Sequence, residues 1–213
     1  MTSTPTEQTS LEEKMNPNTR VLYGIGIDPG SNSGWSLACC GERFGPILVL
    51  ECGVLKKPTG AAVACMYDLC YQVATKHAGA PVLRIHVGIE NQWTPKLDKH
   101  LTEKERRRVA GQIVATVGVA ACRGGFEFMA QARGWPADVW HPQTWRKVLG
   151  KVQGQKRKTV KERALELVRL NSQQYFGGDP PRTVTDDLAE SILINEYNLK
   201  QRQAENLQQR SSR

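Results

Sequence analysis

The chain has 213 residues, of which 39% are hydrophobic and 23% charged, a length that suits one globular domain with a sizeable core. The formal net charge is +8, and residues 141–170 hold nine Lys or Arg against two Glu. Such a basic segment favours a polyanionic partner, nucleic acid before a membrane surface, and a solvated basic face is the plainer alternative. The longest apolar runs, such as Val114–Cys122, are shorter than the roughly 18 residues of a membrane span, so we expect no transmembrane helix.

The N-terminal segment and the cysteines indicate the cellular compartment. Residues 1–14 carry acidic and hydroxyl side chains where a secretory signal would carry basic and then apolar ones. The six cysteines form no C-x-x-C pair and have no histidine at zinc-finger spacing, so we expect no structural zinc site. We interpret them as small buried groups in a reducing compartment. Both features favour a cytoplasmic protein.

Polar segments without hydrophobic periodicity lie at both ends of the chain. We expect residues 1–19 to be a disordered N-terminal tail and residues 201–213 a polar C-terminal tail or frayed helix. The folded domain is then expected over residues 20–200.

The first predicted elements are strands. Residues 21–28 form a short apolar run that ends at Asp-Pro-Gly, a pattern typical of a buried strand followed by a tight turn. Residues 35–40 and 46–54 are each bounded by Gly, which predicts an antiparallel meander of three strands. Apolar residues at helical spacing predict a helix over 61–76, and residues 82–90 predict another buried strand.

A helix with small apolar residues is predicted over 101–122. It is charged at its start and then presents a small-residue face, formed by Ala110, Gly111, Ala115 and Gly118. A helix with such a face packs closely against its own sheet or against a second copy of the chain, and the sequence leaves both open.

The rest of the chain alternates short elements. The periodicity predicts a strand over 137–140, a loop over 171–184, and helices over 142–149, 156–170 and from Thr185 to about Tyr197. Three strands followed by alternating helices and strands indicate a mixed α/β sheet with helices on its faces.

Two of the predicted strands end in a carboxylate, Asp28 and Glu90. An unpaired carboxylate at the edge of a core carries a large desolvation cost unless a cation or hydrogen-bond donors offset it. If the two strands are parallel neighbours, both carboxylates lie at the C-terminal edge of the sheet, where α/β folds place their chemistry. An acid that caps a turn is the alternative for either residue alone.

A third acidic motif, TDDLAES, begins the last predicted helix. Asp187 and Glu190 are three residues apart and Asp186 and Glu190 four apart, so either pair shares one helical face. Ordinary first-turn acids would explain Asp186 and Asp187, and explain Glu190 less well. Packed against the sheet edge, this helix would complete a four-carboxylate cluster, whose hard oxygen ligands select Mg²⁺ or Mn²⁺. Two such ions about 4 Å apart suit the cutting of phosphodiesters.

Three segments carry a resemblance to a known family: GIDPGSNSGW (26–35), GIE (88–90) and DDLAES (186–191). Over about residues 22–197 the chain resembles RuvC-like Holliday junction resolvases of the ribonuclease H superfamily, particularly the phage and bacterial members. The resemblance implies an α/β fold with a ribonuclease H-like mixed five-stranded sheet, three antiparallel strands and then parallel strands, flanked by helices. It also implies a role in DNA recombination and repair in a bacterial or phage-infected cytosol.

The resemblance implies four catalytic carboxylates, carried over by motif: Asp28, Glu90, Asp187 and Glu190. The last position is usually Asp in the family and is Glu190 here. This difference leaves open whether Asp186 or Asp187 is the main metal ligand. The implied cofactor is Mg²⁺, with Mn²⁺ as a substitute and two ions in each active site. The implied products carry a 5′ phosphate and a 3′ hydroxyl.

The resemblance further implies the residues that contact DNA. The family's basic residues fall between the fifth strand and the last helix, a region that here contains Arg146, Lys147, Lys151, Lys156, Arg157 and Lys158. Trp93, three residues after Glu90, matches an aromatic wedge that stacks on unpaired bases, and a Trp folded onto the core is the alternative. We interpret Trp135, Trp140 and Trp145 as core or groove-lining residues.

Family members are homodimers that bind four-way DNA junctions and nick two opposing strands symmetrically. The helix over 101–122 matches the family's dimer helix in position, and two active sites about a two-fold axis suit a symmetric junction.

Other functions remain as alternatives. A kinase of the actin and sugar-kinase superfamily would need a second Gly-rich phosphate loop, which the sequence lacks. A junction-binding module that does not cleave would gain affinity by losing its acids. A nuclease of the same superfamily that acts on flaps, other branched DNA or RNA/DNA hybrids would have the same carboxylates. The sequence therefore leaves this alternative open.

Overall fold

A computed structural model of the protein describes residues 20–42, 45–91, 102–150, 157–178, 181 and 183–212. Its strands are β1 (Val21–Asp28), β2 (Asn32–Gly41), β3 (Leu48–Lys56), β4 (His86–Glu90) and β5 (Ala137–Trp140). They form one sheet in the order β3-β2-β1-β4-β5. β2 is antiparallel to both β1 and β3, whereas β4 is parallel to both β1 and β5. The predicted mixed five-stranded sheet is therefore confirmed.

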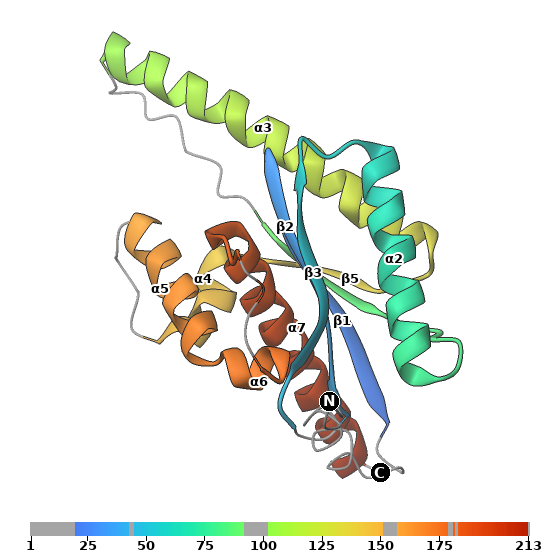
Figure 1. The fold of residues 1–213 in the computed structure, drawn as a ribbon. Coiled ribbons are helices and arrows are strands. Elements are labelled where there is room, and N and C mark those ends of the chain that lie inside the picture. The colour runs from blue at the N-terminus through green and yellow to red at the C-terminus, as the bar shows by residue number, and fades with distance from the viewer. Residues whose placement is uncertain are drawn as a thin grey trace, which may run out of the picture.

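Helices cover both faces of this sheet (Figure 1). α2 (Gly60–Ala78) and the C-terminal part of α3 (Glu103–Ala132) pack on one face, and α7 (Asp186–Ser211) packs on the other. The shorter elements on the α7 side are α4 (Pro142–Trp145), the 3-10 helix η1 (Arg146–Leu149), α5 (Arg157–Leu170) and α6 (Ser172–Phe176).

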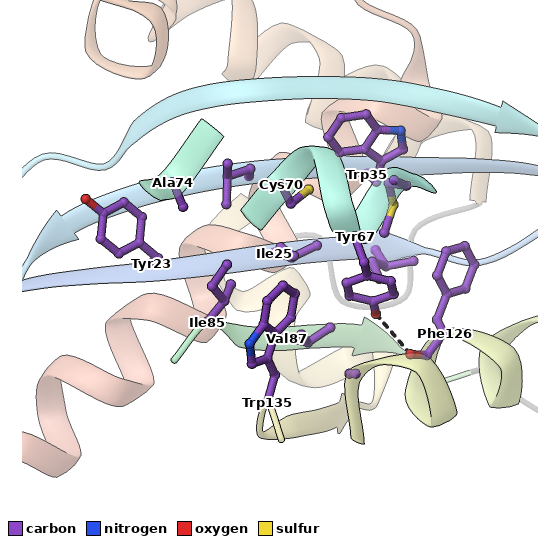
Figure 2. Packing of buried hydrophobic residues seen from close by; sticks show 14 of the residues in the cluster. Tyr23, Ile25, Trp35, Tyr67, Cys70, Ala74, Ile85, Val87, Phe126 and Trp135 are labelled. Atoms are coloured by element: carbon purple, nitrogen blue, oxygen red, sulfur yellow. Dashed lines mark hydrogen bonds between the residues drawn. The ribbon is translucent and has the colours of Figure 1, made fainter. Parts of the chain in front are cut away.

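The core under α2 joins that helix to α3 and to the central strands (Figure 2). Tyr67 of α2 is fully buried, with its ring centroid 5.7 Å from that of Trp135. Its hydroxyl donates a hydrogen bond of 2.9 Å to the backbone carbonyl of Phe126 in α3. Because a buried tyrosine hydroxyl needs such a partner, this contact fixes α2 and the end of α3 relative to each other.

α7 lies against β1 and β2 backbone to backbone, at positions where the strands carry glycine. A Cβ on Gly26 would lie 2.1 Å from the carbonyl oxygen of Ser191, and a Cβ on Gly34 would lie 2.0 Å from that of Asp187. Glycine in a strand allows this close approach of another backbone. Since Gly34 pairs with Asp28 in the β1–β2 ladder, the first turn of α7 is held beside the end of β1.

Buried polar side chains complete the contact between α7 and the sheet. Asn195 is fully buried, and its amide nitrogen donates to the carbonyl oxygens of Gly24 at 2.9 Å and Ser36 at 3.0 Å. The hydroxyl of Ser36 in turn donates to the carbonyl oxygen of Ser191 at 3.0 Å. These direct hydrogen bonds join α7 to carbonyl groups of two strands, so the position of α7 on the sheet is specific.

Several predicted bounds differ from the structure. α7 continues to Ser211, so most of the C-terminal tail expected over 201–213 is helix, and Gln203 is buried with its amide donating to the carbonyl oxygen of Gly41 at 2.6 Å. α3 extends ten residues beyond the expected end, and α6 lies within the predicted loop over 171–184. β4 begins at His86, because the preceding residues 82–85 do not pair with β1. The tail expected over 1–19 lies outside the described residues.

The first part of α3 makes few contacts with the other residues that the structure describes. The predicted small-residue face is exposed, and a Cβ on Gly111 or Gly118 would meet nothing within 4 Å. We expected no such helix from the sequence, yet α3 is long and apolar enough to cross a membrane by length and composition. Only 11% of its most apolar 18 residues are buried. Its last turns are different, since Phe126 and Ala130 are fully buried in the core.

Candidate metal centre

The carboxylates at the ends of β1 and β4 lie side by side, as the sequence predicts. The two strands are parallel, with Ile27 opposite Ile89, so Asp28 and Glu90 leave the sheet at the same edge. Both residues are buried; burial raises the pKa of Asp28, and the nearby charge of Glu90 raises it further. Two buried carboxylates side by side repel each other, and a bound cation would relieve that repulsion.

α7 adds two further carboxylates to this edge. Thr185 caps the helix by accepting a hydrogen bond of 3.2 Å from the amide of Leu188, which fixes the direction of the first turn. Asp187 and Glu190 then point from one face of the helix toward Asp28. Carboxylate oxygens of these three residues lie within 4.8 Å of one another. We call this set, Asp28, Asp187 and Glu190, the carboxylate triad; Glu90 adjoins it through Asp28.

The structure distinguishes the two adjacent aspartates of α7. Asp187 belongs to the carboxylate triad, whereas Asp186 is half-exposed and accepts a hydrogen bond of 2.7 Å from the ammonium of Lys161. The geometry therefore favours Asp187 as a metal ligand, a choice that the sequence left open.

Burial and mutual repulsion shape the electrostatics of the site. Burial raises the pKa of Asp28 well above its usual value, and the nearby charges of Glu90, Glu190 and Asp187 raise it further. The pKa of Asp186 is lowered instead, chiefly by its hydrogen bond from Lys161. Asp28 thus retains a proton to a higher pH than an ordinary aspartate when no cation is bound.

Two basic side chains lie among the acids. Lys161 of α5 lies 2.8 Å from Asp187 and 3.7 Å from Glu190, in addition to its contact with Asp186. Burial alone would lower the pKa of Lys161, but its contacts with these acids raise it. Lys161 was not among the predicted site residues, because a lysine on an amphipathic basic helix gives no local sign of a partner 25 residues away.

Arg146 lies at the same site and not on the open surface. Its guanidinium donates to Oε1 of Glu90 at 3.3 Å and lies 4.0 Å from Glu190. The adjacent Trp145, interpreted from sequence as a core or groove residue, is fully buried and donates its indole N–H to the same Oε1 at 3.1 Å. Both residues therefore contact a candidate metal ligand.

The other predicted DNA contacts are spread along the chain. Lys147 is exposed at the start of η1, and Arg157 and Lys158 begin α5 with side chains outside the described part. Trp93, Lys151 and Lys156 also lie outside the described residues. The small residues predicted for the dimer helix, Ala110, Gly111, Ala115 and Gly118, are exposed on α3.

The donor set of the triad fits a divalent cation. Its oxygens are hard, negatively charged and close enough to share one ion, which is the ligand type that Mg²⁺ and Mn²⁺ prefer. A bound cation would also remove the repulsion that raises the pKa of Asp28.

Comparison with solved structures gives a match over most of the chain. The RuvC of T. thermophilus, solved in complex with a Holliday junction substrate, matches with a TM-score of 0.51 and 16% sequence identity, over 87% of this chain and 97% of RuvC. The chain has the ribonuclease H-like fold of RuvC. In sequence it matches no family model and no curated protein.

Two other resolvases are similar at lower scores than RuvC. The yeast mitochondrial Holliday junction resolvase Ydc2 has a TM-score of 0.46 and 14% identity, over 94% of this chain and 85% of Ydc2. The fowlpox virus resolvase, in complex with Holliday junction DNA, has a TM-score of 0.44 and 10% identity, over 84% of this chain and 98% of the viral protein.

Proposed function

We propose that the protein is a Holliday junction resolvase, an endodeoxyribonuclease that binds four-way DNA junctions as a homodimer and nicks two opposing strands. The observation that carries the proposal is the carboxylate triad, which unites residues from β1 and α7 at one edge of a RuvC-like sheet. A pair of divalent ions held there would activate water for attack on the scissile phosphorus and stabilise the departing 3′ oxygen. Such hydrolysis leaves a 5′ phosphate and a 3′ hydroxyl.

Each acidic residue has a distinct part in this proposal. Asp28 lies next to Glu90 and to Asp187 and Glu190 of α7, so it would be one of the carboxylates that hold the ions. Asp187, Glu190 and Glu90 would supply the other carboxylate ligands. Asp186 would stay with Lys161 outside the ligand set.

The basic residues supply a route for the DNA backbone. Lys147 is exposed next to Arg146, so it would contact a phosphate close to the cluster. Lys151, Lys156 and the start of α5 follow in sequence, and Trp93 is proposed to stack on bases at the junction centre. The exposed small-residue face of α3 would contact the second copy of the chain.

The proposal is tested with four labelled substrates: a mobile four-way junction, a matched linear duplex, a flap and an RNA/DNA hybrid. Each is incubated with Mg²⁺, Mn²⁺ or EDTA, with Asp28→Asn as the inactive control. We expect paired nicks that ligase can reseal in the junction alone, lost in EDTA and in the variant. The variant is expected to keep its junction binding, because it removes a metal ligand and no DNA contact.

Two other outcomes would replace the proposal. Cutting of flaps or hybrids in place of junctions would assign a nuclease of the same fold with another substrate. Tight junction binding without cutting in any metal would assign a binding module.

A further inference from the structure

Trp145 makes a contact that core packing does not require. Its side chain is fully buried among apolar residues of the α7 side, yet its only polar atom points to the carboxylate of Glu90, with an Nε1 to Oε1 distance of 3.1 Å. A buried indole N–H without a partner is costly, and many partners would satisfy it. Here the partner is a buried acid at the candidate metal centre.

Arg146 acts on the same oxygen. Its Nη2 lies 3.3 Å from Oε1 of Glu90, and its guanidinium carbon lies 5.4 Å from the ring centroid of Trp145. Two consecutive residues thus donate to one carboxylate oxygen, and each also contacts the other. The carboxylate of Glu90 cannot rotate without breaking both bonds.

The backbone delivers these two residues to Glu90 directly. β5 pairs with β4 up to Glu90 and Trp140, and the amide of Asn91 extends the pairing by donating to the carbonyl oxygen of Trp140 at 2.7 Å. α4 begins two residues later at Pro142, which is itself buried, and its single turn ends at Trp145. The two hydrogen-bond donors of Glu90 therefore lie only five and six residues after Trp140, its strand partner.

We propose that Trp145 is a positioning residue, which holds Glu90 in the orientation that lets the carboxylate cluster bind divalent ions. With Oε1 bonded to Trp145 and Arg146, the other oxygen of Glu90 is left for the ions. Partners of this kind commonly change metal affinity by about 10- to 100-fold when they are removed. The inference rests on the metal-dependent function proposed above.

The test measures binding of Mn²⁺ by calorimetry, without DNA. Trp145→Phe removes the N–H and keeps an aromatic ring, and we expect it to weaken Mn²⁺ binding by at least about tenfold. Trp140→Phe is the matched control, because it removes an indole N–H that donates to Asn198 at 3.3 Å, away from the cluster. We expect this control to bind Mn²⁺ within about twofold of the unmodified protein.

A double-mutant cycle separates positioning from a general loss of packing. In a Glu90→Gln background, Trp145→Phe is expected to cause no further loss of Mn²⁺ affinity, because its effect passes through Glu90. An additional tenfold loss in that background would overturn the inference. If Trp145→Phe does not fold, 3-benzothienylalanine at position 145 keeps the shape of the indole and replaces its N–H by sulfur, with the same expected loss.

The results separate this inference from the proposed function. Mn²⁺ affinity that is unchanged in a folded Trp145→Phe variant would overturn the positioning role and leave a junction-cleaving enzyme intact. A tenfold loss in a protein that cuts no junction would support the positioning role and overturn the resolvase proposal.

Discussion

The two long helices of this protein contrast in composition and in burial. α7 is rich in polar residues, yet twelve of its residues are buried, including Glu190, Asn195 and Gln203. α3 is apolar enough to resemble a membrane span, yet only three of its residues are buried, and Val114 and Val117 are 72% and 62% exposed. Hydrophobicity therefore does not decide which of the two helices is buried against the sheet.

Backbone access explains the difference. α7 lies over glycines of β1, β2 and β4, so its polar atoms reach strand carbonyls at hydrogen-bonding distance. Buried polar groups are tolerated when such partners exist. The first part of α3 extends past the rest of the domain (Figure 1). Among the described residues, its Val114 and Val117 are largely exposed. Exposed patches of that kind mark interaction surfaces, which agrees with the proposed homodimer.

Alanine in place of one glycine should have the largest effect. In Gly26→Ala the new Cβ would lie 2.1 Å from the carbonyl oxygen of Ser191, so α7 must move. We expect the free energy of unfolding to fall by about 3 kcal/mol. Gly118→Ala on α3 is the control; its Cβ meets open space, and the better helix former should stabilise the chain by up to about 1 kcal/mol. Chemical denaturation measures both. Equal effects would contradict the contrast between the helices.

Removal of a buried amide from α7 should have the next largest effect. Asn195→Ala loses both hydrogen bonds to strand carbonyls, so we expect about 2 kcal/mol less stability. Gln209→Ala, at an exposed position on the same helix, should change stability by less than about 0.5 kcal/mol. A small effect of Asn195→Ala would mean that these bonds do not hold α7 in place.

A charge on the exposed face of α3 should test its proposed partner. Val117 is 62% exposed, so Val117→Asp should leave the free energy of unfolding of the single chain nearly unchanged. If α3 contacts a second copy, the variant should weaken dimerisation by at least about tenfold, because the charge would be buried without a partner. Sedimentation velocity measures the dimer fraction; equal fractions for variant and unmodified protein would place the dimer contact elsewhere.

The acids that α7 adds to the sheet edge should make stability depend on pH. The pKa of Asp28 is raised in the folded state, above the ordinary value of 3.8 expected in the unfolded state. Without metal, the charge of Asp28 therefore destabilises the folded protein at high pH, and this destabilisation is lost as the pH falls through the raised pKa toward 3.8. In EDTA, Asp28→Asn should therefore melt a few degrees above the unmodified protein at pH 8, with a smaller difference at pH 5. The facing groups are Glu90, Glu190 and Asp187, with Lys161 and Arg146 beside them. A difference that grows on acidification would contradict the raised pKa.

Local pattern was enough to predict much of the fold. The bounds of β1 and β5 match the prediction, because β1 is an apolar run that ends at a turn signal and β5 is bounded by Pro136 and by the helix start at Pro142. α7 was predicted to stop near Tyr197, where the apolar periodicity ends. It continues because Gln203 and Arg202 find partners on distant strands, at Gly41 and at Asp138. Such contacts leave no periodic signal in the sequence.

The sequence by itself determined which acids stand at strand ends and on one helical face, since the period of each element fixes where its side chains point. It therefore indicated Asp28, Glu90 and the acids of α7 as one cluster. Only the tertiary structure decided that Asp187 and not Asp186 joins the triad, and that Lys161, Arg146 and Trp145 contact the acids. Those contacts depend on how closely α7 and α4 approach the sheet, which is set by packing between segments far apart in the chain.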